Sequence, residues 1–112
     1  MKTIRDFDGF TSRYQFDFDL CSAPKGYAQI DTSQDASYFG IWANPDLLIV
    51  ATYCEGDITV RIAESDAEFV AEIREIKRWN EDNGHRFSGI DGMCNETLID
   101  RFEALGLGDL LH

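Results

Sequence analysis

Carboxylates are the side chains whose type and spacing come closest to catalytic chemistry in this chain. Asp17 and Asp19 occupy alternate positions, and Glu55 and Asp57 stand on either side of Gly56. A catalytic pair of carboxylates needs two unequal environments, so that one group donates a proton while the other stays ionised. Alternate positions on one strand face, or the two sides of a turn glycine, expose both groups to water alike. We therefore interpret these acids as a solvated polar surface.

The cysteines and histidines do not form a metal-binding pattern. Zinc ligands usually come in pairs a few residues apart, whereas nine positions separate His85 from Cys94 and His112 has no such neighbour. Residues 6–9 begin like a calcium loop, but the phenylalanine and threonine at positions 10 and 11 break the required alternation of oxygen ligands. The sequence predicts no metal and no cofactor.

Motifs that activate a nucleophile or cradle a phosphate are also missing, since the sequence contains no G-x-S-x-G, P-loop or G-x-G-x-x-G pattern. Cys54 and His85 would form a catalytic pair only if the fold brought them together. Cys54 ends an apolar run, where cysteine behaves as a small hydrophobic residue. His85 follows a helix stop signal, where imidazole can bond the last carbonyls. The sequence favours a protein without catalytic activity.

The alternative is a small enzyme or ligand-binding domain with a cleft beside residues 84–95. Its polar groups would be His85, Asp91 and Cys94. His85 is the group in this set that titrates nearest neutral pH, so it is the best candidate for proton transfer.

Aromatic side chains would complete such a site if one face of the sheet were open. Tyr38, Trp42 and Tyr53 could share the face away from the long helix, and an exposed aromatic patch marks an interaction site. Apolar side chains are more often buried. We expect another helix or the C-terminal tail to cover these three residues.

The strongest compositional signal is charge, because 21 Asp and Glu face only 10 Lys and Arg, a net charge of −11 over 112 residues. Phosphate-binding surfaces need lysine and arginine, so direct binding to nucleic acid or to an anionic membrane is excluded. An acidic surface instead steers association with a basic protein, such as the phosphate-binding face of a nucleic-acid-handling partner. The alternative is that the acidity only keeps the protein soluble. The candidate binding surface comprises Asp17, Asp19, Asp31, Asp35, Glu55 and Asp57.

The elements that position these residues follow from hydrophobic periodicity. Alternation of apolar and polar residues predicts half-buried strands, and the nearly continuous apolar run at 47–54 predicts a central strand buried on both faces. The expected strands are 14–20, 27–31, 37–43, 47–54 and 58–62, with a turn at 44–46 and a hairpin at 55–57. Thr3 would cap a short first helix.

Two helices are expected after the strands. Residues 65–68 match a capping box, apolar residues then recur at helical spacing from Phe69 to Trp79, and Asn83-Gly84 stops the helix. Asn95 would cap a last helix that ends at Gly106, and the apolar tail would dock on the body. Strands first and helices later predict a single α+β domain over residues 1–112, with a mostly meandering antiparallel sheet of four to five strands.

The residue patterns also bear on location and assembly. The N-terminus has no apolar signal region, the run 47–51 is too short to cross a bilayer, and three cysteines give no disulfide framework, so we expect a cytoplasmic protein. The 27–31 strand carries little Lys or Pro to guard a sheet edge, so a homodimer through that edge is a third hypothesis.

The central stretch resembles a known group of proteins. Segments 26–32, 42–45 and 53–57, together with the Leu105–Asp109 tail, are similar to small uncharacterised proteins of bacterial plasmids and integrative mobile elements. The resemblance implies an accessory role in mobile-element biology. It implies no activity and no active-site residues.

Overall fold

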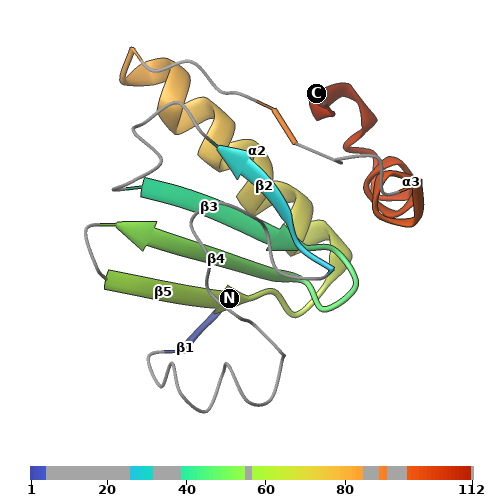
Figure 1. Ribbon diagram of the computed structural model, residues 1–112, viewed down its shortest axis with the longest axis horizontal. Coiled ribbons are helices and arrows are strands. Elements are labelled where there is room, and N and C mark those ends of the chain that lie inside the picture. The colour runs from blue at the N-terminus through green and yellow to red at the C-terminus, as the bar shows by residue number, and fades with distance from the viewer. Residues whose placement is uncertain (5–25, 32–38, 55–56, 85–88, 91–95, 112) are drawn as a thin grey trace.

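A five-stranded antiparallel sheet with one long helix across a face forms the body of the protein (Figure 1). The computed structural model describes residues 1–4, 26–31, 39–54, 57–84, 89–90 and 96–111. The strand order is β1-β5-β4-β3-β2, and every neighbouring pair is antiparallel. The expected α+β class with a meandering sheet is therefore confirmed. The predicted strand over 14–20 lies outside the described residues.

The four strands β2 to β5 follow one another as a meander. Their bounds are β2 (Ala28–Asp31), β3 (Phe39–Asn44), β4 (Ile49–Cys54) and β5 (Asp57–Ile62). Cys54 pairs with Asp57 in the register, which agrees with the predicted tight hairpin. The β2–β3 pairing shifts register between Gln29 and Asp31, so this edge strand contains a bulge.

The first strand, β1 (Lys2–Ile4), overturns the prediction that Thr3 caps a helix. Thr3 lies in the middle of β1 and pairs with Arg61 of β5. The physical reason is that an open β5 edge offers unpaired backbone groups to a nearby extended segment. A single threonine in the sequence does not indicate that this segment pairs with β5.

The first three residues of β4 are buried on both faces, as predicted, whereas Leu47 and Leu48 of the predicted strand lie in the turn before it. Ile49, Val50 and Ala51 have no exposed surface although they point alternately to opposite sides. Val50 belongs to the core cluster beneath the long helix, and Trp42, Ile49 and Ala51 occupy the opposite face.

Helix α2 (Asp66–Asp82) covers one face of the sheet (Figure 1). Ser65 is its N-cap, and the Ser65 hydroxyl accepts the Glu68 amide at 3.2 Å, as the capping box predicts. Phe69, Ile73 and Ile76 are buried against the sheet. The helix ends at Asp82 with Asn83 as its C-cap, and Gly84 takes a φ of +76°.

The carboxyl end of α2 lacks the basic side chains that often interact with a helix dipole there. The last turn of α2 contains no base, because Lys77 and Arg78 lie one turn earlier. They bond to Glu81 and Glu75, respectively, on the same helix. These pairs stabilise the helix surface without neutralising its carboxyl end.

Helix α3 (Glu96–Ala104) and the short helix η1 (Gly108–Leu110) close the chain. Gly106, at a φ of +79°, follows α3, and the Leu107 amide donates to the Phe102 carbonyl in the six-to-one bond of a Schellman motif. Leu107 and Leu110 are buried, and Leu111 bridges Ile90 in parallel. The tail therefore docks on the body, as expected. The predicted cap Asn95 lies outside the described residues.

Candidate functional site

The predicted acidic surface is only partly within the described residues. Asp17, Asp19, Asp35 and Glu55 lie outside them. Asp31 ends β2, and Asp57 begins β5. The register places both residues toward the same end of the sheet, with β3 and β4 between them. Three strand spacings, about 14 Å, separate these positions across the sheet, and they are offset by two residues along the strands.

The residues of the alternative ligand site are mostly outside the described part of the chain as well, namely His85, Asp91, Cys94 and Tyr38. Trp42 is the exception. It lies in β3, is only 2% exposed, and its indole sits so close over Gly40 that a Cβ there would be 2.6 Å away. Burial of Trp42 was expected and is confirmed, so this residue adds nothing to an exposed aromatic patch.

A pocket of about 290 Å³ opens between the C-terminal half of α2 and the sheet. Figure 1 shows this half of α2 above the end of the sheet where β3 and β5 begin and β4 ends. This is the same end that carries Asp31 and Asp57. The described residues that line the pocket are Ile41, Thr52, Arg61, Glu72, Glu75, Ile76, Trp79 and Asn80.

Trp79 is the pocket residue that sequence reasoning misplaced. It was expected on the apolar face of α2, but it is 54% exposed. Asn80 takes the buried position instead, is 1% exposed, and donates its side-chain amide to the Ile76 carbonyl at 2.9 Å. At 100° per residue, position 80 lies about 20° from Phe69 around the helix and position 79 lies about 80° away. These angles can be calculated from the sequence, and they indicate that position 80, not position 79, faces the sheet.

Charged groups of the pocket are already organised. Arg61 of β5 pairs with Glu72 of α2, and their side chains are 30% and 17% exposed. Glu75 accepts from Arg78 Nη2 at 2.7 Å (Oε1) and 2.6 Å (Oε2), which raises the pKa of the Arg78 guanidinium. Among the described residues that line the pocket, both carboxylates are therefore already paired with an arginine.

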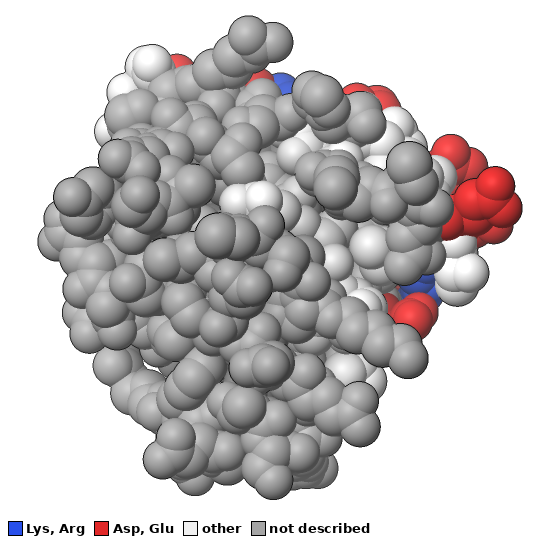
Figure 2. All heavy atoms as spheres, in the orientation of Figure 1, with Lys and Arg blue, Asp and Glu red and all other residues white. Residues whose placement is uncertain are grey.

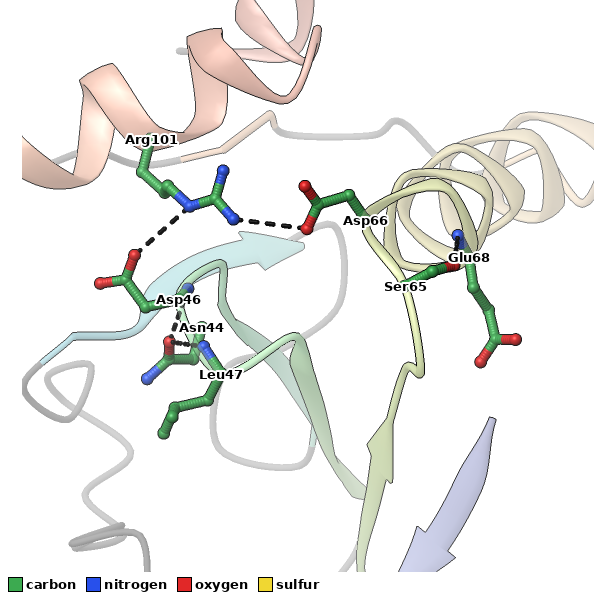
Figure 3. A network of polar contacts seen from close by, with 7 residues as sticks. All are labelled: Asn44, Asp46, Leu47, Ser65, Asp66, Glu68 and Arg101. Carbon is green, nitrogen blue, oxygen red and sulfur yellow. Dashed lines mark hydrogen bonds and ion pairs between the residues drawn. The ribbon is translucent and has the colours of Figure 1, made fainter.

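Arg101 of α3 joins three elements at the opposite end of α2. Figure 3 shows its guanidinium between Asp46, in the β3–β4 turn, and Asp66, in the first turn of α2. The turn itself is ordered by the Asn44 side chain, whose oxygen accepts the amides of Asp46 and Leu47. Arg101 therefore connects α3 to the β3–β4 turn and to the first turn of α2.

The acids of α3 contrast with its arginine. Glu96, Asp100 and Glu103 are exposed and form one stripe at spacings of four and three residues. None of them makes an ion pair with a described cation, whereas each described arginine does. Figure 2 shows carboxylates gathered on the right, where Figure 1 places α3. This stripe is acidic surface that sequence reasoning did not select.

Metal clusters and membrane-spanning helices are two further features that would indicate a function. No group of three or more His, Cys, Asp or Glu that could hold a metal ion occurs among the described residues. No helix in the described ranges is both long and apolar enough to cross a membrane.

No protein-family model matches the chain, and neither the curated proteins nor the solved structures contain a match.

The sheet-edge homodimer stays a prediction. Among the described strands, β2 is the last in the sheet order, which agrees with the predicted edge position of the 27–31 segment. Its bulge interrupts the regular row of backbone groups that a partner strand would need.

Proposed function

We propose that this protein is a non-catalytic interaction protein that binds a basic surface on a partner protein. The observation that carries the proposal is the state of its charges. The described arginines are each paired with a carboxylate, while the three acids of α3 are exposed and lack a described cationic partner. With a net charge of −11, the molecule has negative surface to offer and little positive surface to interfere.

The partner fits a particular chemistry. A basic surface that normally carries phosphates has closely spaced lysine and arginine, and an acidic protein can occupy it in place of nucleic acid. On this proposal the protein inhibits or modulates a nucleic-acid-handling partner in the cytoplasm, as an accessory factor of a mobile element. Electrostatic steering would make association fast and sensitive to salt.

The test is capture from a nuclease-treated bacterial lysate at low salt, followed by elution in a salt gradient and mass spectrometry. Basic nucleic-acid-binding proteins should elute as the salt rises, because salt screens exposed charges. A double reversal, Glu96→Lys with Glu103→Lys, should release them at lower salt. The reversal of Asp31 and Asp57 tests the predicted surface in the same way.

A matched control separates a defined surface from net charge alone. Glu64 and Asp82 are exposed and make no ion pair with a described cation. Reversing both to lysine changes the net charge by the same amount as the double reversal on α3. This control should elute closer to the unmodified protein than the α3 variant does. Capture of no basic protein above background would contradict the proposal and leave the acidity as a solubility feature.

The second candidate is a ligand-binding or catalytic domain near residues 84–95. The pocket beside the end of α2 is the observation that favours it, because small-molecule sites are concave and mostly apolar with a few polar groups. A thermal-shift screen with small metabolites distinguishes the two candidates. Stabilisation by a neutral metabolite, without capture of any basic protein, would favour this second function.

A further inference from the structure

We propose that Asn83 is a site of spontaneous deamidation, and that its product weakens the carboxyl end of α2. Asn83-Gly84 is the one Asn-Gly pair among the four asparagines of the sequence. Glycine after asparagine favours this reaction, because it has no Cβ to shield its backbone nitrogen. Both residues are exposed, and no described heavy atom beyond the chain neighbours lies within 4 Å of where a Gly84 Cβ would stand. The two reacting groups therefore lie together at the surface.

The reaction needs only water as a co-reactant. The Gly84 backbone nitrogen loses its proton and bonds to the Asn83 Cγ, the Cγ–Nδ2 bond breaks, and ammonia leaves with that proton. Water then opens the cyclic imide at either carbonyl. Opening at the side-chain carbonyl gives aspartate, and opening at the backbone carbonyl gives isoaspartate. In both products a neutral amide has become a carboxylate.

The helix cap slows this reaction in the folded protein. The Asn83 ψ of 12° turns the Gly84 nitrogen away from the Asn83 side chain, so the ring closes only after rotation about that bond. Rotation breaks the 3.2 Å bond from the Gly84 amide to the Glu81 carbonyl. The Asn83 Nδ2 must also release the Trp79 carbonyl, to which it donates at 2.8 Å. Because helix ends open locally more easily than helix interiors, these two bonds delay the reaction without preventing it.

Two other described asparagines provide references within the same molecule. Asn44 is followed by Pro45, which has no backbone N–H to lose. Asn80 is 1% exposed, and its side-chain amide is bonded to the Ile76 carbonyl inside the helix. Neither combines an exposed amide with a following backbone nitrogen that can attack it.

The new carboxylate stands at an unfavourable position. The carboxyl end of a helix carries partial negative charge, and the last turn of α2 holds no base to offset it. Glu81 and Asp82 come just before position 83. A carboxylate also cannot donate to the Trp79 carbonyl, as the Asn83 amide does. Deamidation therefore adds repulsion and removes a cap bond at the same end of the helix.

The first test follows the whole chain by peptide mapping and mass spectrometry during incubation at mildly alkaline pH. Aspartate and isoaspartate should accumulate at position 83, while Asn44 and Asn80 stay intact. The same chain unfolded in guanidinium chloride should react at position 83 about tenfold faster, because the two cap bonds are absent there. An intact Asn83 in the folded protein, after the unfolded chain has reacted completely, would overturn the proposal. Equal reaction at Asn80 would overturn it as well.

The second test measures what the product does to the helix. Asn83→Asp reproduces one product and should lower the melting temperature by about 2–5 °C. Thr97→Asp is the matched control, because it adds the same charge at an exposed position in the first turn of α3, where the helix dipole favours it. It should lower the melting temperature less. An unchanged melting temperature for Asn83→Asp, or equal losses in the two variants, would show that the carboxyl end of α2 is not weakened by the product.

Discussion

Helices α2 and α3 both carry more acid than base, yet they use their charges differently. On α2, three bases bond to carboxylates, and Glu72 reaches across to Arg61 of the sheet. On α3, the single arginine bonds to acids of other elements, and the helix's own three acids have no described cationic partner. The comparison shows that net charge alone does not identify an interaction surface. What distinguishes the two helices is which acids the fold has already paired.

The largest effects test whether both helices belong to one core. Ile73 of α2 and Phe102 of α3 have no exposed surface and belong to the same cluster. Ile73→Ala should lower the free energy of unfolding by about 2–5 kcal/mol, and Phe102→Ala by about 3–5 kcal/mol. Urea denaturation followed by circular dichroism measures both. The exposed Thr97→Ala is the control on α3. A loss below about 1 kcal/mol for Phe102→Ala would show that α3 is only loosely attached.

An intermediate effect tests the paired and unpaired acids directly. Glu72→Gln leaves the Arg61 guanidinium, which is 30% exposed, with a weaker partner, and should cost about 1–2 kcal/mol of unfolding free energy. Glu103→Gln should leave stability unchanged, since Glu103 is exposed and has no described cationic partner. Thermal denaturation at neutral pH compares the two variants. Equal destabilisation by both would remove the distinction between the helices.

The smallest effect concerns the pH dependence of the Arg74–Asp109 pair. Arg74 donates to both carboxylate oxygens of Asp109 at 3.1 and 2.9 Å, and this holds the Asp109 pKa below its ordinary value of 3.8. A depressed folded-state pKa stabilises the fold above the unfolded pKa, and the contribution is lost as the pH falls through the folded pKa. Unmodified protein and Asp109→Asn should therefore differ slightly in stability at neutral pH, and the difference should shrink below about pH 4.

The pair is exposed, so salt provides the control for this prediction. At about 1 M salt the difference between the two proteins should also shrink, because the Debye length falls to about 3 Å. Stability curves against pH that stay parallel through the acid range would contradict the assignment.

Much of the fold was predictable because its signals are local. Three patterns each predict a structure within a few residues. They are the capping box at Ser65, the glycines after both helices and the apolar run of β4. Strand β1 was not predictable in this way. Its pairing partner, β5, lies more than 50 positions later in the sequence, and three residues carry no periodicity.

The pocket was harder to predict than the fold. Its lining comes from β3, β4, β5 and α2, so no single segment contains its pattern. Trp79 looked like a core residue because tryptophan is large and apolar, and Asn80 looked like a surface residue because it is polar. Their exchanged environments follow from their angular positions on α2, which residue type alone does not indicate. Acidic composition was visible at once, but ion pairing between distant elements was not.

The outermost strands also bear on how the protein behaves when it is abundant. β1 has three residues, β2 has four, and the register of β2 shifts within it. A further strand added to either edge would form only a few consecutive backbone bonds before the pattern broke. In the described part of the sheet, strand length and shape therefore disfavour stacking into fibres. This effect should persist in acid or high salt, where repulsion between the negative surfaces no longer keeps molecules apart.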